Sequence, residues 1–515
     1  MEREHKNARV EVLLSCLIPV VGLSNFWRFP VLAYENGGGV FWYVYALTTL
    51  TIGISTHYLS LSLGQFTSAC GVNLYSQFGV GFSGIAVTHA YSCFCITTYY
   101  SILSSRVIQK CEHGVVNWII VICVTISNII VVFYLSAKPF KMHKVCSALF
   151  ILPSVITCAF TGIAASMPGG AIGIQNFFVS DFSYLTKVDF WFNAVSHCLF
   201  SMGEGLGVLA VWSSRNYFTM NLKWVSSLVT LFQVCQTCMI GMITSAVLSN
   251  LSDFNEDLMT IMSGSEGVPF IVYSVVLYDL VDTTFIVAIT FFVIMYVIAL
   301  LSIANLFYLG MTVVYQIIPA SYIPNTTSIL LAFICFLTSF MYATQEGSVL
   351  ITLINGTCVP VLIVTTTLIE LIVIMYFYGI QEICLDFRYM FQKRVYLFLR
   401  VIWGILLPIT LILTLVSYLV SSPLLYTSNY KSIISWIVII IGLFPIPLWM
   451  LYHICAYKNE SWQERLKHVF DASGFGPKNL DDREAWSIFK EEELQDRVEE
   501  NDGRCVRFLN SLIGK

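Results

Sequence analysis

Long apolar stretches separated by short polar segments dominate the first 457 residues. Most of these stretches are long enough to cross about 30 Å of hydrocarbon as a helix. The stretches are continuously apolar and do not alternate, which disfavours a membrane β-barrel. We therefore predict an all-α polytopic membrane protein. Its twelve transmembrane helices are expected near residues 10–33, 40–66, 85–109, 115–137, 145–165, 190–213, 225–248, 284–317, 328–343, 358–379, 395–420 and 433–457.

Helix-weakening and polar residues interrupt the first of these stretches. Pro19 and Gly22 weaken the helix, and Ser24 and Asn25 add hydrogen-bonding groups at mid-membrane depth. Arg28 then places a charge in an apolar context, at a cost of about 2.5–3.5 kcal/mol on insertion scales. A broken helix is tolerated at this depth only where its freed backbone groups line a cavity or are buried in protein. We therefore predict a discontinuous, ligand-binding first helix.

The sixth stretch shows a similar interruption. Gly203, Gly205 and Gly207 stand at alternate positions around Glu204 in an otherwise apolar run. Small residues alone also serve close helix packing, but an ionisable residue inside a span suggests a functional site. The first and sixth spans occupy corresponding positions in two halves of five spans. This arrangement predicts a five-plus-five inverted repeat with broken first and sixth helices and a binding site between them.

Charge is concentrated at the end of the chain. Only 11% of the 515 residues are charged and 57% are hydrophobic, yet residues 458–515 hold 23 of the 58 charged residues. The net charge of −4 singles out no charged partner, and we expect a lipid bilayer around the helices and no nucleic acid. The predicted domains are a cytoplasmic N-terminal segment, a twelve-helix transporter domain and a charged cytoplasmic C-terminal tail, at 1–9, 10–457 and 458–515.

The distribution of Lys and Arg predicts the orientation. Basic residues gather before the first span and in the loops at 138–144 and 388–394, whereas the loop at 253–282 is acidic. Positive loops stay in the cytoplasm, and an even number of spans puts both termini on one side. We expect a multi-pass plasma-membrane protein with both termini cytoplasmic. Since there is no nucleophile–base motif, metal-ligand cluster or phosphate-binding loop, we do not expect an enzyme.

Several motifs closely resemble the neurotransmitter:sodium symporter family. They are GLSNFWRFP at 22–30, YENGGG at 34–39, SLSLGQF at 60–66, FSMGEGLGVL at 200–209 and TQEGSVLITLIN at 344–355. The resemblance extends over about residues 3 to 457 and identifies the chain as a divergent member. It implies a sodium-coupled symporter of amino acids or related small zwitterionic solutes. It does not determine the individual substrate or the oligomeric state.

The resemblance also implies two sodium sites. The first uses backbone near Val20 with the side chains of Asn25, Ser201 and Gln233, where the family usually has asparagine in place of Gln233. Hard cations need several oxygens at short range, and these residues can supply them.

The second site is weaker. It would rest on backbone near Ile18 and Val21 with Ser302, because Leu301 stands at a ligand position and cannot coordinate a cation. A sodium ion there would therefore have few protein oxygens.

Chloride and gate positions follow from the same resemblance. The chloride set is Tyr45, His197, Ser201, Gln233 and Thr237. Chloride dependence stays open, because His197 replaces a glutamine of the family.

The extracellular gate pairs Arg28 with position 355. The family has an acid there, and this chain has Asn355. The gate is therefore expected to lack its ion pair.

Gly22 bears on the substrate. Amine-transporting members have Asp at this position, whereas glycine leaves room for a substrate carboxylate to approach the sodium ion. Tyr100 matches a tyrosine that hydrogen-bonds the carboxylate, and Phe200 matches an aromatic lid. The implied substrate-binding residues are Gly22, Ser24, Tyr100, Phe200, Glu204 and Leu206.

Glu204 and the overall function each leave alternatives open. Glu204 could pair with a substrate ammonium, take up a proton during transport, or pair structurally with a neighbour such as His197. The whole chain could instead be a non-transporting solute-binding sensor or scaffold. The lost gate acid and the weak second sodium site favour that alternative, whereas the intact first-span motif favours a transporter.

Overall fold

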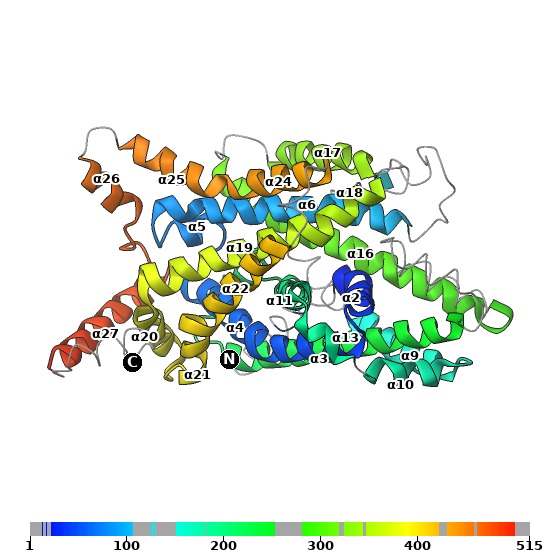
Figure 1. Ribbon diagram of the computed structural model, residues 1–515. Coiled ribbons are helices and arrows are strands. Elements are labelled where there is room, and N and C mark those ends of the chain that lie inside the picture. Colours follow the sequence, from blue (N-terminus) through cyan, green and yellow to red (C-terminus); the bar gives the residue numbers. More distant parts are fainter. Residues whose placement is uncertain are drawn as a thin grey trace.

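The computed structural model describes residues 22–106, 151–179, 181–252, 281–318, 324–342, 347–421, 430–457 and 461–499, with five isolated residues besides. Within these ranges all regular elements are helices and none is a strand, which confirms the predicted all-α class. Figure 1 shows long helices that run in similar directions, with α20 and α27 at one end and α10 at the other.

Residues 22–252 contribute the first group of helices. These are α2 (Leu23–Glu35), α3 (Gly39–Thr48), α4 (Ile54–Thr67), α5 (Val72–Tyr75), α6 (Gly84–Arg106), α9 (Ile151–Ser166), α10 (Gly170–Phe178), α11 (Val188–Met202), α12 (Val208–Ser213) and α13 (Leu222–Ser252). A π-helical segment, Thr49–Gly53, joins α3 to α4, so that residues 39–67 form one continuous span.

Residues 281–499 contribute the second group. These are α16 (Val281–Ile317), α17 (Pro324–Tyr342), α18 (Gly347–Leu353), α19 (Val359–Ile372), α20 (Ile380–Phe391), α21 (Leu397–Val401), α22 (Leu407–Ser421), α24 (Tyr430–Leu443), α25 (Pro445–Ala456), α26 (Trp462–Val469) and α27 (Leu480–Glu499). Helix α6 packs along α16, and α4 packs along α12.

Seven helical spans within the described ranges are long and apolar enough to cross a membrane. An eighth results if the bent pair Ser154–Ser166 and Gly170–Thr186, with an angle of 111° between its halves, counts as one span. The protein is therefore a multi-pass membrane protein. The predicted span at 115–137, and the part of the first span before Gly22, lie almost wholly outside the described residues, so twelve spans and the five-plus-five repeat stay predictions.

The predicted break in the sixth span is confirmed. Helix α11 ends at Met202, and α12 begins only at Val208. Gly203, Gly205 and Gly207 have φ angles of 77°, 65° and 70°. This left-handed backbone is readily available only to glycine, since a side chain there meets the following carbonyl oxygen. The alternating glycines therefore unwind the helix in mid-span.

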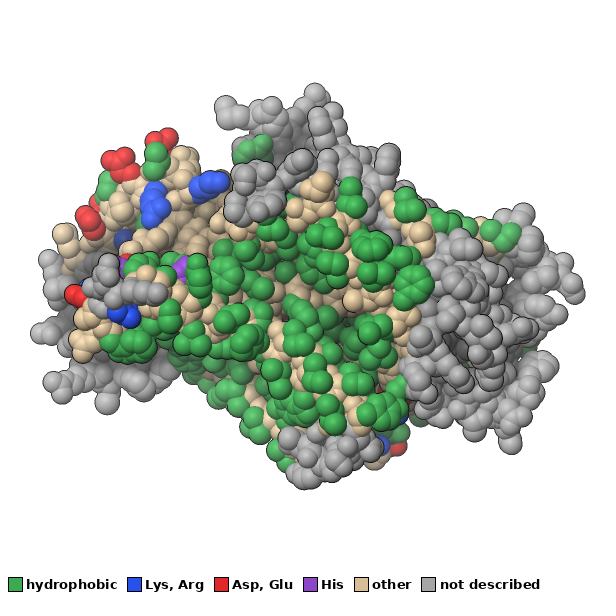
Figure 2. All heavy atoms as spheres, turned by 90° about the horizontal axis from the view of Figure 1, so that it is seen from above, with side chains coloured by type: hydrophobic (Ala, Val, Ile, Leu, Met, Phe, Trp, Pro, Cys, Tyr) green, Lys and Arg blue, Asp and Glu red, His purple; other side chains and the backbone are tan. Residues whose placement is uncertain are grey.

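The outer surface is apolar over a broad area. Figure 2 shows hydrophobic side chains covering the face formed by α17, α24 and α25, with charged side chains gathered at one end. Large side chains that are exposed on these helices are Ile329, Leu330, Phe333, Ile334, Leu337, Ile433, Ile437, Ile440, Ile441, Leu448 and Leu451. An exposed apolar area of this kind is what a lipid-facing surface requires, because the acyl chains solvate it.

The described part of the C-terminal tail packs against the helical domain. On α27, the Trp486 indole N–H donates to Asp386 Oδ1 of α20 at 2.9 Å, and Lys490 Nζ lies 3.2 Å from the same oxygen. Arg388 and Glu493 form a further ion pair at 2.8 Å. The tail was predicted as a solvated segment, but these contacts dock α27 onto α20. The domain boundaries given above stay predictions.

Candidate functional site

The start of α2, where the first span is predicted to be broken, is held by a helix far away in the sequence. Gly22 has an extended backbone, with φ −68° and ψ 168°, and α2 starts at Leu23. The Leu23 N–H donates to Ser302 Oγ of α16 at 3.1 Å. The first N–H groups of a helix lack partners within it, so Ser302 satisfies one of them. Ser302 therefore lies beside the break, as its predicted role in the second sodium site requires, while Ile18 and Val21 lie outside the described residues.

Four predicted ion-site residues meet in one fully buried cluster. Asn25 Nδ2 donates to Gln233 Oε1 at 2.9 Å, and Gln233 Nε2 donates back to Asn25 Oδ1 at 3.0 Å. Gln233 Nε2 also donates to the Tyr45 hydroxyl at 2.7 Å, which lies 2.9 Å from Ser201 Oγ. Tertiary structure thus joins residues of α2, α3, α11 and α13. Val20, the remaining predicted member of the first sodium site, lies outside the described residues.

This cluster supplies the oxygens for a hard cation but uses them for hydrogen bonds. Asn25, Ser201 and Gln233 offer two amide oxygens and a hydroxyl, the ligand types that such ions prefer. The NH₂ group of Gln233 donates to both Asn25 and Tyr45, so it stands where a cation would meet these oxygens. An amide N–H cannot coordinate a cation. The residues therefore fit a sodium ion only once the Asn25–Gln233 pair opens.

The predicted chloride residues surround the same cluster. The His197 ring lies 5.2 Å from the Tyr45 ring and 5.8 Å from the Phe29 ring. Neither His197 nitrogen has a hydrogen-bond partner within the described part of the chain. Thr237 Oγ1 donates to backbone carbonyls of its own helix, at Gln233 and Val234. An anion could therefore receive an N–H from His197, whereas the Thr237 proton is already committed.

The predicted gate and substrate residues border one another. The Arg28 guanidinium lies over the Phe200 ring at 5.3 Å. Asn355 Oδ1 accepts a hydrogen bond of 3.2 Å from Tyr99, whose ring is 4.9 Å from that of Tyr100. The Tyr100 and Ser24 side chains also interact, which brings the third span to the start of α2.

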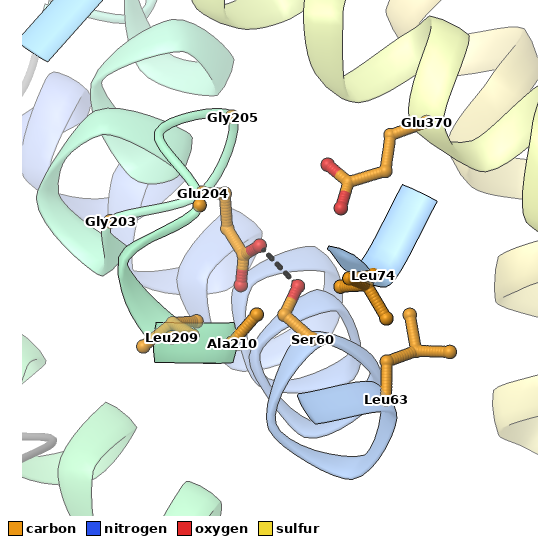
Figure 3. Close-up of a pocket in the computed structure, with 10 residues that line it drawn as sticks. Ser60, Leu63, Leu74, Gly203, Glu204, Gly205, Leu209, Ala210 and Glu370 are labelled. Atoms are coloured by element: carbon orange, nitrogen blue, oxygen red, sulfur yellow. Dashed lines mark hydrogen bonds between the residues drawn. The ribbon is translucent and has the colours of Figure 1, made fainter. Parts of the chain in front are cut away.

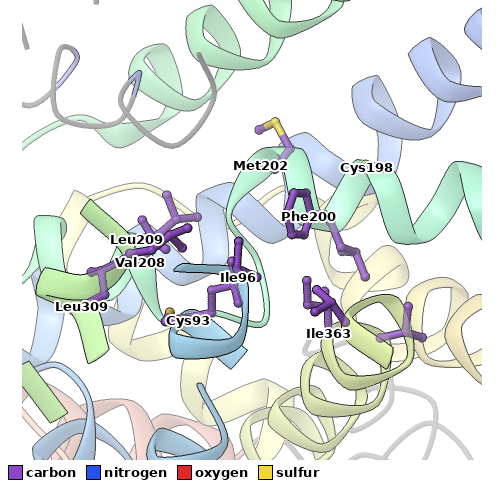
Figure 4. Packing of buried hydrophobic residues seen from close by; sticks show 14 of the residues in the cluster. Cys93, Ile96, Cys198, Phe200, Met202, Val208, Leu209, Leu309 and Ile363 are labelled. Carbon is purple, nitrogen blue, oxygen red and sulfur yellow. The ribbon is translucent and has the colours of Figure 1, made fainter. Parts of the chain in front are cut away.

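An apolar wall completes this region. Figure 4 shows Phe200 of α11, Ile96 of α6 and Ile363 of α19 lining one region near the unwound segment. Leu206 is buried, and its carbonyl accepts a contact of 3.7 Å from Cys93 Sγ. The unwound segment is therefore packed against α6 on this side, and Leu206 contributes through its backbone.

Glu204 lies on a different side of the unwound segment. Its Oε2 accepts a hydrogen bond of 2.7 Å from Ser60 Oγ of α4 (Figure 3). It lines a pocket shared with Glu370 of α19, and none of the other predicted substrate residues lines that pocket. The structural alternative was a pair with a neighbour such as His197, and the neighbour that bonds Glu204 is Ser60 instead of His197. Sequence reasoning missed Glu370, although an acid within the predicted tenth span was a signal for it.

Comparison with known proteins agrees with the motifs. The chain matches the sodium:neurotransmitter symporter family over residues 3–110 and 103–457. The chain belongs to this family. Among similar curated symporter-family proteins are those named sodium-dependent nutrient amino acid transporter 1 from Drosophila willistoni, Drosophila mojavensis and Drosophila melanogaster.

Each of these relatives is 24% identical to the chain. The matches cover 96%, 98% and 99% of this chain and 91%, 92% and 92% of the relatives. Membership of the symporter family confirms the predicted resemblance, and the members of this family are transporters, not enzymes.

Proposed function

We propose that this protein carries amino acids or related small zwitterionic solutes across the plasma membrane together with sodium. The buried cluster of Asn25, Tyr45, Ser201 and Gln233 is the observation that supports this most strongly. It joins both interrupted spans at the depth where the first helix begins, and it contains the oxygens that sodium needs. The printed names of the Drosophila relatives favour an amino acid as the solute.

The surroundings of Gly22 support a substrate carboxylate. Gly22 has no side chain, and Ser24 and Tyr100 place hydroxyl groups near the start of α2. The free N–H groups of a helix N-terminus attract negative charge. Phe200, with Arg28 above its ring, closes the same region. We propose that Gly22, Ser24, Tyr100, Phe200 and the backbone of Leu206 bind the solute.

Glu204 has less support as a substrate-binding residue. Pairing with a substrate ammonium would require its carboxyl to face Tyr100 and Ser24. Its hydrogen bond instead goes to Ser60, and the pocket it lines also contains Glu370. Of the two functional roles considered for Glu204, uptake of a proton has the better geometry.

A solute-binding sensor is the second candidate function. The closed Asn25–Gln233 pair favours it, because a cation must first separate the two amides. Asn355 also cannot form the ion pair of the family gate, and it accepts a hydrogen bond from Tyr99. A sensor of this type would bind the solute without carrying it across.

Uptake measurements distinguish the two functions. The full chain, reconstituted into liposomes, is given radiolabelled amino acids with an inward gradient of sodium or of choline. A transporter accumulates at least one amino acid in sodium and much less in choline. Binding of a labelled amino acid to the protein, without accumulation in either salt, contradicts transport and supports the sensor.

Shortening Gln233 should strengthen the effect of sodium. In Gln233→Asn, the amide loses one methylene and cannot bond both Asn25 and Tyr45, so the Asn25 oxygen becomes available. We expect half-maximal uptake at a sodium concentration several-fold lower than in the parent. Gln236→Asn on the same helix α13 is the control, because Gln236 accepts only a long hydrogen bond of 3.4 Å from Asn25. Equal sodium dependence in Gln233→Asn and the parent would contradict an obstructing role for Gln233.

Orientation can be tested with epitope tags. Because Lys and Arg concentrate in alternate loops, we propose that both termini are cytoplasmic. A tag after Lys515 should bind antibody only after the cells are permeabilised. A tag inserted in the acidic loop at 253–282 should bind on intact cells. Binding at Lys515 on intact cells would reverse the proposed orientation.

A further inference from the structure

A second buried polar site lies beside the unwound segment, away from the proposed solute and sodium residues. Figure 3 shows the carboxyl groups of Glu204 and Glu370 directed into one pocket. Glu204 belongs to the unwound segment, and its side chain is 3% exposed. Glu370 comes from α19. Ser60 and Leu63 of α4 line the floor between them.

The pocket has few groups that stabilise negative charge. Glu204 accepts its hydrogen bond from Ser60, and Glu370 accepts one of 2.5 Å from the Tyr75 hydroxyl. No Lys or Arg is among the described residues that line the pocket. Two neighbouring carboxylates that are buried without a cation are strongly unfavourable, because desolvation and mutual repulsion act together. At least one of the two carboxyls therefore requires a positive charge.

Unpartnered polar atoms point to a small ligand. Glu204 Oε1 is buried and has no hydrogen-bond partner within the described residues. His89 Nε2 on α6 is also buried without a hydrogen-bond partner there, and lies 4.0 Å from Glu370 Oε2. Buried polar groups in proteins are normally satisfied. Unused hydrogen-bonding capacity on Glu204 in the pocket, and on His89 beside Glu370, therefore marks it as a site and not merely as a group of acids.

We propose that Glu204 and Glu370 form a proton-binding site, in which this pair of buried carboxyls carries one proton. The proton comes from water, and no other bond is made or broken. Carboxyl pairs that share one proton titrate as a unit. The other titratable groups that face the pair are Tyr75 of α5, His89 of α6 and the Cys198 thiol of α11. None of them supplies a fixed positive charge.

The site joins elements from separate parts of the chain. Glu204 and Ser60 belong to the broken sixth span and to α4, whereas Tyr75, His89 and Glu370 belong to α5, α6 and α19. Separating the two groups would free each carboxyl to ionise in water and release the proton. This consequence rests on the proposed transport function, but proton binding itself does not.

Thermal stability against pH tests the site without substrate or sodium. The unfolded chain has both glutamates ionised above about pH 6. A folded state that keeps a proton therefore loses stability as the pH rises, by about tenfold in the folding equilibrium per pH unit while the proton stays bound. We expect the unfolding midpoint of the full-length protein in detergent to fall between about pH 6 and about pH 9.

Three variants and a control isolate the pair. Glu204→Gln and Glu370→Gln should each flatten this fall, because an amide replaces the protonated carboxyl and leaves one charge. Tyr75→Phe should extend the fall to higher pH, because the hydroxyl that favours ionised Glu370 is gone and the folded state keeps its proton longer. Glu484→Gln, at an exposed position of α27, should keep the parent's profile. A parent profile in both glutamate variants would overturn the proposal.

Infrared spectroscopy of the parent protein covers the case in which the variants fail to fold. The parent should show a protonated carboxyl band near neutral pH that disappears in alkaline solution. Absence of this band near neutral pH would overturn the proposal. Sodium provides the last comparison: if sodium replaces the proton and removes the band at neutral pH, the pocket is a sodium site and the proton assignment is wrong.

Discussion

Asn25→Ala is expected to weaken sodium-dependent uptake strongly. The substitution removes an amide oxygen from the buried cluster and leaves the Gln233 amide without its partner. A bound sodium ion would lose one of its oxygen ligands, and a polar interaction with a charged group contributes about 1.5–3 kcal/mol, where each 1.4 kcal/mol corresponds to about tenfold in an equilibrium constant. The apparent affinity for sodium should therefore fall about tenfold or more. Uptake measured as a function of sodium concentration gives this value directly.

Asn36→Ala is the matched control for this experiment. Asn36 lies at the other end of the same helix α2, and its side chain donates to the Leu32 carbonyl at 2.8 Å. We expect a modest loss of stability and unchanged sodium dependence. If Asn25→Ala reaches the surface and retains the parent's sodium dependence, the first sodium site does not include Asn25.

Gly205→Ala is expected to disrupt the unwound segment and eliminate transport. Gly205 has a φ of +65°, and a Cβ there would lie 2.7 Å from Thr367 Oγ1 and 2.8 Å from the Ile363 carbonyl oxygen. The left-handed backbone alone costs an alanine about 1–2 kcal/mol, and the contact with the α19 backbone adds to this. We expect the unfolding midpoint of the purified protein to drop and uptake to be lost.

Gly356→Ala provides the comparison for Gly205→Ala. Gly356 lies in the π-helical segment Ile354–Cys358, and no atom comes within 4 Å of the position that its Cβ would take. Alanine should be tolerated there, with uptake near the parent level. Equal stability and uptake in the two variants would show that the unwound segment does not need glycine at position 205.

The sequence predicted much of the local structure because its signals are local. Alternating glycines at 203, 205 and 207 predicted the break in the sixth span, since each adopts a backbone that only glycine readily adopts. Long apolar runs predicted the all-α membrane fold, because the length of each run is a property of a continuous segment and can be compared directly with the thickness of the bilayer. Most helix ends differed by a few residues, but the tenth span, predicted at 358–379, extends over Val349–Phe391. The fourth span and the beginning of the first stay predictions.

The sequence also predicted which residues belong to the ion site, but it did not predict their hydrogen-bond partners. Asn25 and Gln233 were both predicted at the first sodium site, from a resemblance that is carried by motifs. That their amides pair, with the longer Gln233 side chain also reaching Tyr45, depends on how α2, α3 and α13 cross. The one extra methylene of glutamine lets its amide reach both Asn25 and Tyr45 only at the particular spacing that these three helices have in the fold.

Glu204 and Glu370 show most clearly what only the tertiary structure decided. The sequence analysis marked Glu204 as unusual, because an ionisable side chain inside a span must find a partner or a ligand, and the same signal at Glu370 was missed. Composition and helical periodicity describe neighbours along one helix, and these two residues are far apart in the chain. Packing of the unwound segment against α4 and α19 gave Glu204 the Ser60 hydroxyl and placed Glu370 in the same pocket. The sequence determined that buried charge had to be neutralised, and the three-dimensional arrangement of the helices determined which groups share that task.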